Sequence, residues 1–402
     1  MADAPSLAVP RLDDLALAGR RVLIRVDFNC PQDDAGRITD DTRIRAALPT
    51  IREVLAKGGR PILLSHLGRP KGRVVESLRL APMGERLAEL LECQVVSLPE
   101  STGPAVEAAI AAARPGAVVL LENVRFHVGD EQGDLQLAAQ WARLGDVFVN
   151  DAFGAAHRDH ASVCGLARLL PAAAGRLLER EITAFRRVLE VPERPLVAIL
   201  GGAKVSDKLQ VVDHLLDVVD ALLVGGGMAY TFLVAQGVAV GRSLVQHDQV
   251  DAVRAALAKA AARGVQVLLP DDHVCAEAFE AGARPIPCGA AIPDGLLGLD
   301  IGPRTRERYA ARIRTAQTLV WNGPMGVFEW PAFRAGTEAV GRAVAECPGY
   351  TVVGGGDSVA AVELLGLADR IRHISTGGGA SLELLEAGTL PGIQALQAAT
   401  GS

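Results

Sequence analysis

Short apolar runs alternate with longer segments rich in Ala, Leu, Arg and Glu along most of the chain. The short runs have the length and the turn-residue borders of strands buried on both faces, and the longer segments have the pattern of helices. A repeated strand–helix–strand order favours parallel strands joined by right-handed crossover connections. The pattern therefore predicts an α/β protein built on parallel sheets.

The predicted elements fall into two halves of the sequence. The strands of the first half are expected at Arg21–Val26, Pro61–Ser65, Gln94–Ser97, Ala117–Leu121 and Val147–Asn150. Those of the second half are expected at Pro195–Leu200, Ala221–Val224, Val265–Leu269, Thr318–Trp321 and Tyr350–Val353. The helices expected in the first half include Thr42–Lys57, Met83–Glu92 and Leu135–Leu144. An uninterrupted helical segment, Arg176–Glu190, ends shortly before Pro192 and is the natural joint between the halves.

Composition narrows the possible functions. A chain of 402 residues has room for roughly two to three domains of ordinary size. The formal charge of −6 argues against a nucleic-acid surface, and no apolar run approaches the ~18 residues of a membrane span. The first residues lack the basic segment and apolar core of a signal peptide, so we expect a cytoplasmic protein. The six cysteines include no C-x-x-C pair, which favours reduced thiols over a disulfide or zinc framework.

The stretch Leu196–Lys208 (LVAILGGAKVSDK) carries a strong local signal for ligand binding. Its apolar run stops at Gly201 and Gly202, and Lys204 and Lys208 follow four residues apart. If a helix opens near Lys204, both ammonium groups lie on one face beside its electropositive N-terminus, an arrangement that attracts phosphate. A helix with a solvated cationic edge would show the same spacing. The G-x-x-x-x-G-K-[ST] order of a Walker motif is absent.

The residues that follow the expected strands differ between the halves. Ligands of open α/β sheets collect at the carboxyl ends of the strands. In the first half these ends carry Asp27-Phe28-Asn29, His66-Leu67-Gly68-Arg69, Arg125 and His157-Arg158, with Arg43 near the start of the first helix. In the second half they carry Gly201-Gly202-Ala203-Lys204, Gly225-Gly226-Gly227, Asn322-Gly323-Pro324 and Gly354-Gly355-Gly356-Asp357-Ser358.

Both sets of residue types suit anions. Arginines gathered at a sheet edge favour a small, multiply charged anion, because each guanidinium donates two parallel hydrogen bonds to a carboxylate or phosphate. Glycine turns let the backbone approach a ligand, and N–H groups at helix starts bind phosphates. Asp357 offers an oxygen ligand for the Mg²⁺ that polyphosphates carry. Each feature alone is weak, since glycine turns often serve tight backbone geometry and single arginines are usually solvated.

Ten sequence blocks, in the expected order over nearly the whole chain, together resemble the phosphoglycerate kinase family. They are RVDFNCP (Arg25–Pro31), DDTRIRAALPTI (Asp40–Ile51), SHLGRPKG (Ser65–Gly72), LENVRFH (Leu121–His127), NDAFGAAHRDHAS (Asn150–Ser162), GGAKVSDK (Gly201–Lys208), GGGMAYTF (Gly225–Phe232), NGPMGVFEW (Asn322–Trp330), GGGDS (Gly354–Ser358) and STGGGASLE (Ser375–Glu383). The departures are small: Ser358 stands where threonine is usual, and Cys30 replaces an aliphatic residue. Cys30 is expected to be a small buried side chain, although a position in the substrate cleft would open it to alkylation.

The resemblance implies two doubly wound parallel-sheet domains joined by a helical hinge, with a cleft between them. A phosphoglycerate-binding domain is expected at 1–175, a hinge helix at 176–192 and a nucleotide-binding domain at 193–388. A tail at 389–402 is expected to pack back near the hinge or the N-terminal domain. The implied reaction is reversible phosphoryl transfer from 1,3-bisphosphoglycerate to ADP in glycolysis, giving 3-phosphoglycerate and ATP with Mg²⁺. A monomer that binds neither nucleic acid nor membrane is expected.

The resemblance also assigns roles to residues. The implied substrate-binding residues are Asp27, Phe28, Asn29, Arg43, His66, Leu67, Gly68, Arg69, Arg125 and Arg158. The implied nucleotide-binding residues are Gly202, Ala203, Lys208, Gly226, Asn322, Pro324, Glu329, Gly355, Gly356, Asp357 and Ser358, with Asp357 also binding the metal. Catalytic roles at the transferred phosphoryl group fall to Arg43, Lys204, Gly377 and Gly378.

The residue types agree with this chemistry. The acceptor is a carboxylate with a pKa of roughly 4, so no general base is needed. Catalysis then reduces to positioning, charge stabilisation and the exclusion of water by domain closure. His66 and His157 are therefore expected to hydrogen-bond the anion or to support the site. Two alternatives remain. One is a nicotinamide-dependent dehydrogenase, but the G-x-G-x-x-G motif of such an enzyme follows no strand in the first half of this chain. The other is a catalytically silent metabolite-binding protein of the same fold.

Overall fold

The structure, a computed structural model, describes residues 6–399, which fold as two compact units. Here the N-terminal unit means residues 6–183 with 389–399, and the C-terminal unit means residues 184–388. The division falls within α7 (Arg176–Leu189), inside the segment that the sequence marks as the joint. The outer ends of the expected first domain and tail, residues 1–5 and 400–402, lie outside the described residues. Between residues 6 and 399, no helix has the length and apolar character needed to cross a bilayer.

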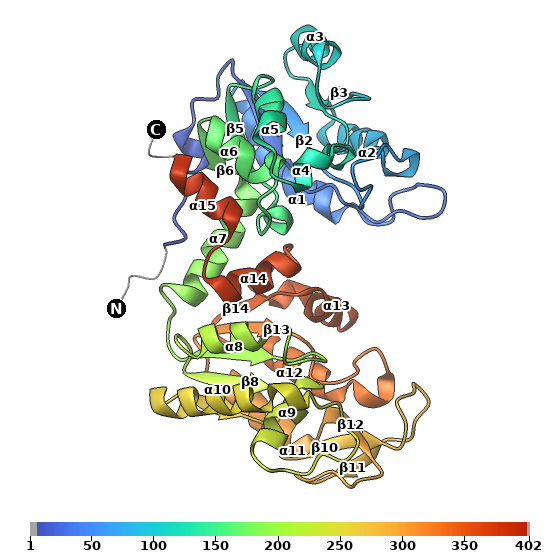
Figure 1. The fold of residues 1–402 in the computed structure, drawn as a ribbon, viewed down its shortest axis with the longest axis vertical. Coiled ribbons are helices and arrows are strands. Elements are labelled where there is room, and N and C mark those ends of the chain that lie inside the picture. Colours follow the sequence, from blue (N-terminus) through green and yellow to red (C-terminus); the bar gives the residue numbers. More distant parts are fainter. Residues whose placement is uncertain (1–5, 400–402) are drawn as a thin grey trace. The chain divides into compact units, whose positions relative to one another are not determined.

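The N-terminal unit is built on a six-stranded, all-parallel sheet in the order β3-β4-β2-β1-β5-β6. Its strands are β1 (Arg21–Arg25), β2 (Arg60–Leu64), β3 (Val95–Ser97), β4 (Val118–Leu120), β5 (Val147–Asn150) and β6 (Ala172–Ala174). Its helices, besides the first half of α7, are α1 (Thr42–Ala56), α2 (Ala81–Leu91), α3 (Pro104–Ala112), α4 (Val128–Glu131), α5 (Leu135–Ala142), α6 (Leu166–Leu169) and α15 (Pro391–Ala398) (Figure 1). The expected strands are confirmed to within one residue at each end. The additional strand β6 consists of alanines, which carry no strand signal.

The core of the N-terminal unit forms because its central strands are apolar on both faces. β1, β2 and β5 are buried along almost their whole length, and α1 adds Ile44, Ile51 and Val54 to the same cluster. Cys30 lies in this core with 4% of its surface exposed, and burial raises the pKa of its thiol to about 11. The prediction of a small buried side chain at Cys30 is therefore confirmed.

The tail of the chain packs on the N-terminal unit. α15 contacts α6 and β6, and the N–H of Gly392 donates to the carbonyl of Ala156 at 2.8 Å. Leu390, Ile393 and Leu396 are almost completely buried. This unit is therefore completed by residues from the far end of the sequence.

The C-terminal unit contains a second six-stranded parallel sheet, in the order β15-β14-β13-β7-β8-β9. Its strands are β7 (Leu196–Leu200), β8 (Ala221–Val224), β9 (Gln266–Leu268), β13 (Thr318–Asn322), β14 (Tyr350–Val353) and β15 (His373–Ile374). Its helices are α8 (Leu209–Leu215), α9 (Met228–Ala235), α10 (Val250–Arg263), α11 (Pro303–Ile313), α12 (Ala335–Ala345), α13 (Gly356–Leu364) and α14 (Gly379–Ala387). The five expected strands are again confirmed to within one residue at each end. Within this parallel sheet, the two-residue β15 is the one strand that the sequence did not predict.

The C-terminal unit also contains a small antiparallel sheet that the sequence did not predict. It has the order β11-β10-β12 and consists of β10 (His273–Ala276), β11 (Ile286–Cys288) and β12 (Leu297–Ile301). β11 was hard to predict from the sequence because it contains Pro287, and within sheets proline is confined to edge strands. Val274 and Leu299 pack with Phe333 in a separate small core.

Each parallel sheet has one point at which its strand order reverses. In the N-terminal unit this switch point lies between β1 and β5, and in the C-terminal unit it lies between β7 and β13. Crevices at the carboxyl ends of the strands beside a switch point are the usual ligand sites of open α/β sheets. The loops that follow these four strands are therefore where binding residues are expected to meet.

Candidate functional site

An ion pair lies at the switch point of the N-terminal sheet. Asp27 follows β1, and its Oδ2 accepts a hydrogen bond from Nη1 of Arg43 on α1. Gly154, in the loop after β5, lies against this pair, and a Cβ added to it would be 2.7 Å from Oδ2 of Asp27. Burial alone would raise the pKa of Asp27, but the charges of the neighbouring Arg43 and Arg25 hold it below its usual value. Asp27 is therefore an ionised carboxylate that orients Arg43.

His66 and Arg25 stand beside this ion pair. Arg25 is completely buried and donates through Nε to Oγ of Ser162 at 3.0 Å and through Nη2 to Nδ1 of His66 at 3.2 Å. Because a guanidinium only donates, Nδ1 of His66 accepts, and Nε2 carries the proton of the neutral ring. Burial lowers the pKa of His66 well below its usual value. The ring is therefore neutral at neutral pH and offers one N–H donor.

The loop after β2 is held by side chains from two other loops. Oδ1 of Asn29 accepts a hydrogen bond from the N–H of Gly68 at 2.8 Å, and Nη1 of Arg125 donates to the carbonyl of Gly68 at 2.7 Å. Gly68 has a φ of +63°, and a Cβ there would lie 2.7 Å from Leu78. Arg125 is mostly buried, with its Nε 3.4 Å from Oε1 of Glu131. These bonds bring the loops after β1, β2 and β4 together.

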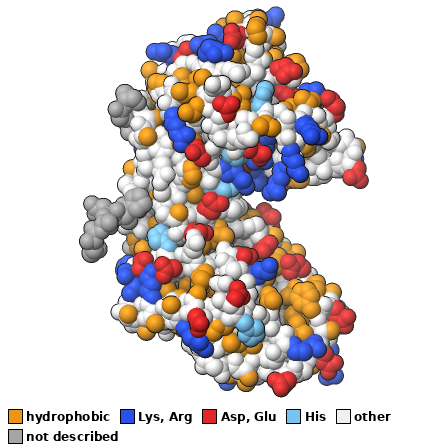
Figure 2. All heavy atoms as spheres, viewed as in Figure 1, with side chains coloured by type: hydrophobic (Ala, Val, Ile, Leu, Met, Phe, Trp, Pro, Cys, Tyr) orange, Lys and Arg blue, Asp and Glu red, His pale blue; other side chains and the backbone are white. Residues whose placement is uncertain are grey.

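The other residues predicted for this half differ in exposure. Phe28 and Leu67 lie in the hydrophobic core, so only their backbone can contact a ligand. Arg69 and Arg158 are exposed. Burial lowers the pKa of Arg125, and the charge of Arg158 lowers it further, so these two guanidinium groups are neighbours. Figure 2 shows Lys and Arg side chains gathered on the surface of this unit. The arrangement is a cationic surface beside a partly buried carboxylate.

A cavity of about 290 Å³ lies at the carboxyl end of the C-terminal sheet. Its lining includes several of the residues predicted to bind nucleotide, namely Gly202, Ala203, Gly226, Pro324, Glu329 and Asp357. Gly202 and Gly226 have φ values of +108° and +66°, and a Cβ on Gly226 would lie 2.6 Å from the backbone nitrogen of Gly202. Glycine is needed here because two turns pack backbone against backbone.

No helix opens near Lys204, so the condition for a shared cationic face of Lys204 and Lys208 is not met. α8 begins at Leu209, with Lys208 as its N-cap residue, so the two lysines share no helical face. Nζ of Lys208 instead donates to the carbonyls of Gly201 and Asn322, at 2.7 and 3.0 Å, where β7 and β13 end. The side chain of Lys208 folds back over the glycine turn to reach both carbonyls. The backbone becomes helical only after Lys208.

The charges of Lys208 and Asp357 interact at the edge of the cavity. Burial lowers the pKa of Lys208 to about 8, while the charge of Asp357 works in the opposite direction. Asp357 stands in the first turn of α13 and lines the cavity. An anion that reached Lys208 would favour its charged form. The site is therefore suited to phosphate.

Asn322, Gly355 and Ser358 shape the turns around the cavity. Nδ2 of Asn322 donates to the carbonyl of Gly354 at 3.0 Å, and Oγ of Ser358 accepts from the N–H of Gly323 at 2.5 Å. Gly355 caps α13 with a φ of +89°, where a Cβ would lie 2.7 Å from Nδ2 of Asn322. Both polar side chains are buried, so they hold the turns in place. The helix that starts at the next residue, Gly356, presents its backbone N–H groups there.

Lys204, Gly377 and Gly378, predicted to meet the transferred phosphoryl group, also belong to the C-terminal unit. Lys204 is exposed in the turn after β7. Gly377 and Gly378 precede α14, with Gly378 as its N-cap residue at a φ of +52°. Arg43 belongs to the N-terminal unit, so its meeting with Lys204 stays a prediction.

Sequence reasoning missed the apolar wall of the cavity. Tyr230, Leu244, Phe279 and Val327 line it together with Gly298. Leu244 and Phe279 are 49% and 67% exposed, although large apolar side chains are usually covered. Each of these two side chains appears in the sequence as a single apolar residue in a loop. A single residue forms no periodic pattern that could be recognised. An apolar wall beside a glycine turn suits a ring system attached to a phosphate.

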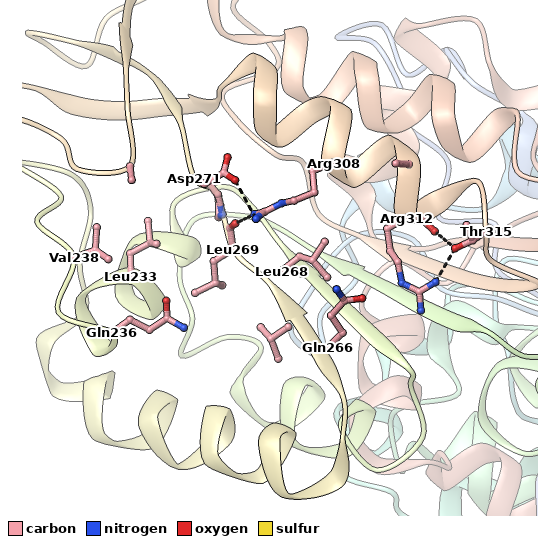
Figure 3. Close-up of a pocket in the computed structure, with 14 residues that line it drawn as sticks. Leu233, Gln236, Val238, Gln266, Leu268, Leu269, Asp271, Arg308, Arg312 and Thr315 are labelled. Atoms are coloured by element: carbon pink, nitrogen blue, oxygen red, sulfur yellow. Dashed lines mark hydrogen bonds and ion pairs between the residues drawn. The ribbon is translucent and has the colours of Figure 1, made fainter.

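A larger cavity, of about 770 Å³, lies along β9 and α11 in the same unit (Figure 3). Arg308 pairs with Asp271 there at 3.0 Å, and Nη1 of Arg312 donates to Thr315 at 2.7 Å. None of the substrate-binding, nucleotide-binding or catalytic residues predicted from the sequence lines this cavity. Size alone therefore does not identify the functional site.

Known proteins resemble this chain along nearly its whole length. A family profile described as phosphoglycerate kinase matches residues 12–388. The phosphoglycerate kinase of Moorella thermoacetica is 58% identical over 386 residues, which cover 96% of this chain and 98% of the relative. That of Chloroflexus aurantiacus is 56% identical over 390 residues, covering 96% and 98%. The structure of phosphoglycerate kinase from Coxiella burnetii superposes with a TM-score of 0.91 at 41% identity, covering 98% of this chain and 100% of that one.

Proposed function

Because the chain belongs to the phosphoglycerate kinase family and transfers a phosphoryl group between 1,3-bisphosphoglycerate and ADP, we propose that its two switch-point sites divide the substrates. In this proposal the N-terminal unit binds the phosphoglycerate and the C-terminal unit binds the nucleotide. The observation that carries it is the chemical contrast between the sites. One gathers guanidinium groups around an ionised carboxylate, and the other combines glycine turns, a buried ammonium and an apolar wall.

The acid is held in the N-terminal unit by charge. The exposed Arg69 and Arg158 and the nearby Arg125 donate paired hydrogen bonds to its phosphate and carboxylate oxygens. The Nε2–H of neutral His66 donates a further bond. Asp27 accepts from the hydroxyl group of the acid and keeps Arg43 oriented. The remaining predicted residues, Phe28, Asn29, Leu67 and Gly68, build the loops that place these groups.

The nucleotide is held in the C-terminal unit by shape and by backbone. Leu244, Phe279 and Val327 pack against the base, and the carboxylate of Glu329 accepts from the ribose. The phosphates lie at the N-terminus of α13, where backbone N–H groups and the helix dipole favour negative charge. Lys208 exchanges its two carbonyl partners for a phosphate oxygen. Gly202, Ala203, Gly226, Asn322, Pro324, Gly355, Gly356 and Ser358 form the turns that leave room for it.

Transfer of the phosphoryl group needs no proton to move. The attacking carboxylate is ionised at neutral pH, so the residues of the chain act by position and charge. Arg43, Lys204 and the N–H groups of Gly377 and Gly378 compensate the charge that spreads over the equatorial oxygens. The step requires the two units to bring their ligands together and to exclude water, which could attack in place of the carboxylate.

Mg²⁺ fits the residues of the nucleotide site. It usually takes one or two carboxylates together with phosphate oxygens and water. Asp357 and Glu329 are the carboxylates that line the cavity, and Asp357 stands at the start of α13, close to the proposed phosphates. We assign Asp357 as the protein ligand; the bound ion would neutralise charge on the phosphates.

The proposal extends to the setting of the enzyme. The first unit acts as the phosphoglycerate domain, α7 as the hinge and the second unit as the nucleotide domain, in a monomer without nucleic-acid or membrane partners. The six cysteines are free thiols, which suits the reducing cytoplasm.

A coupled assay tests the assignment of substrates. The protein is mixed with Mg²⁺-ATP, and ADP formation is followed with and without 3-phosphoglycerate. ADP is expected to form only when 3-phosphoglycerate is present. An equal rate without the acid, or no rate with it, would contradict the proposal.

A further inference from the structure

Two cysteines lie side by side on the antiparallel sheet of the C-terminal unit, outside both proposed sites. Cys275 is on β10 and Cys288 is on β11. The register pairs Cys275 with Ile286 and His273 with Cys288, so both thiols project from the same face of the sheet as diagonal neighbours. The Cys288 thiol acts on the pKa of Cys275, so the two side chains are near neighbours. Diagonal neighbours lie farther apart than the two ends of a disulfide, so joining the two sulfur atoms requires a local movement of the strands.

The two thiols differ in their access to solvent. Cys275 is completely buried, and burial together with the Cys288 thiol raises its pKa. Cys288 is only partly buried, and its Sγ donates a weak hydrogen bond to the carbonyl of Ile286 at 3.8 Å. A small oxidant thus reaches Cys288 first, with Cys275 placed to react next. An accessible thiol beside a resolving thiol is the usual arrangement of a reversible redox pair.

The face that carries the thiols supports the apolar wall of the proposed nucleotide cavity. Tyr230 of α9 packs on this face, with its ring centroid 5.6 Å from that of His273. A Cβ on Gly298 would lie 2.0 Å from the Tyr230 hydroxyl. Burial raises the pKa of Tyr230, and the nearby Cys275 and Cys288 raise it further. Because Tyr230 and Gly298 line the cavity, movement of the thiol pair reaches the wall directly.

We propose that Cys275 and Cys288 form a reversible disulfide on exposure to a peroxide, and that this modification weakens nucleotide binding. The Cys288 thiolate attacks one peroxide oxygen; the S–O bond forms, the O–O bond breaks, and the departing hydroxide takes up a proton as water. The Cys275 sulfur then attacks the sulfenic sulfur; the S–S bond forms, the S–O bond breaks, and the hydroxyl leaves as water with the Cys275 proton. Two thiols are oxidised and one peroxide is reduced, and a dithiol reverses the change.

The effect on binding follows from the length of the new bond. A disulfide places the two sulfur atoms about 2 Å apart, closer than two thiols can approach without reacting. β11 is therefore drawn toward β10 beneath Tyr230, which shifts the wall of the cavity. This second half of the proposal rests on the nucleotide site assigned above, whereas the disulfide itself does not.

Peptide mapping and calorimetry test the two halves separately. The intact protein is treated with hydrogen peroxide, its free thiols are alkylated, and it is cleaved after Glu277 and Glu280, which separates the two cysteines. Trypsin does not separate them, because Arg284 precedes Pro285. A linked pair of peptides that dithiothreitol releases is expected. The Kd of ADP is expected to rise by about fivefold or more, the low end of coupled binding effects, and to recover on reduction.

Two matched variants act as controls. Cys288→Ser should abolish both the linked peptides and the peroxide effect on ADP binding, while Cys347→Ser, another partly buried cysteine of this unit, should keep both. The affinity for 3-phosphoglycerate should not respond to peroxide. Oxidation of Cys288 without a link to Cys275 would overturn the disulfide, and a link without a change in ADP affinity would overturn its effect. Reduced protein that binds no ADP would instead contradict the nucleotide site, and the peptide map would still decide the disulfide.

Discussion

Arg43 and Lys208 are cations whose partners in the structure differ from their proposed partners in the reaction. Arg43 is paired with Asp27, and Lys208 donates to two carbonyls at the switch point. These bonds hold each cation in place before a phosphate arrives, which lowers the cost of ordering it during the reaction. The sequence could identify both residues by their loops and motifs. It could not predict the carbonyl of Asn322 as a partner of Lys208, because the two residues are 114 positions apart in the chain.

Arg43→Ala should lower kcat by about 100-fold or more, because one cation that stabilises the transferred phosphoryl group is lost. Arg43→Lys should recover only part of the rate, since an ammonium keeps the charge without the planar pair of donors. Steady-state kinetics measure both. Arg45→Ala is the matched control on α1, where Arg45 forms an exposed ion pair with Asp41 at 2.8 Å. Similar losses in Arg43→Ala and Arg45→Ala would contradict the catalytic role.

ADP binding should weaken as the pH rises above about 8. The pKa of Lys208 is about 8 without ligand, and a phosphate raises it, so binding takes up a proton near this pH. Above it, the Kd should rise by up to about tenfold per pH unit. Calorimetry between pH 7 and 9, in buffers of different ionisation enthalpy, measures both effects. Lys208→Arg does not titrate in this range, and an unchanged pH profile in that variant would show that another group is responsible.

At the scale of elements, the sequence predicted the parallel strands well and the rest less well. β7 and β13 are buried along their whole length, so each appears in the sequence as an apolar run. β10, β11 and β12 are short, and β11 contains Pro287, so local patterns do not mark them. The apolar wall of the proposed nucleotide cavity was missed for a related reason. Its side chains come from separate segments and are brought together only by the fold.

The start of α7 depends on a buried carboxyl group. Oδ1 of Asp151 accepts from the N–H groups of Leu177 and Leu178 at 2.9 and 3.3 Å, and burial raises the pKa of Asp151 to about 7. A carboxyl group whose pKa is raised by folding stabilises the fold below its unfolded pKa, and this contribution is lost as the pH rises through the folded value. Wild-type stability should therefore fall between pH 4 and pH 7 on account of this group.

Asp151→Asn keeps an acceptor oxygen and removes the titration. The free energy of unfolding of the variant minus that of the wild type should rise by up to about 4 kcal/mol between pH 4 and pH 8. This rise follows from the difference of about three units between the folded and unfolded pKa of Asp151. Urea unfolding at several pH values measures the difference between the two proteins. A difference that stays constant with pH would mean that folding does not raise the pKa of Asp151.

α15 should contribute measurably to the stability of the N-terminal unit. Ile393 is completely buried, so Ile393→Ala should lower the free energy of unfolding by about 2–4 kcal/mol through lost burial and a new cavity. Gln394 is its exposed neighbour, and Gln394→Ala should change stability by no more than about 0.5 kcal/mol. Denaturant unfolding compares the two variants. Equal effects would mean that the helix does not pack on the unit in solution.

At the scale of the whole molecule, two sheets of the same architecture are proposed to bind two different ligands. Each has its switch point beside its first strand in sequence order, β1 in one unit and β7 in the other. The fold therefore supplies the same crevice twice, and only the loop residues make one cationic and the other rich in glycine. The sequence already shows this difference in residue type at the strand ends, and the division of substrates that it indicates stays a prediction. The proposed meeting of Arg43 with Lys204 stays a prediction, because no local pattern of the sequence encodes a contact made only during the reaction.

One calorimetric experiment tests the division of substrates most directly. Arg69 and Glu329 are both exposed, so Arg69→Ala and Glu329→Ala should leave the fold intact. Each removes a charge-assisted hydrogen bond, whose loss weakens binding by about tenfold or more. We predict that Arg69→Ala weakens only 3-phosphoglycerate and that Glu329→Ala weakens only ADP. Loss of the opposite ligand in either variant, or of both ligands in one, would contradict the account.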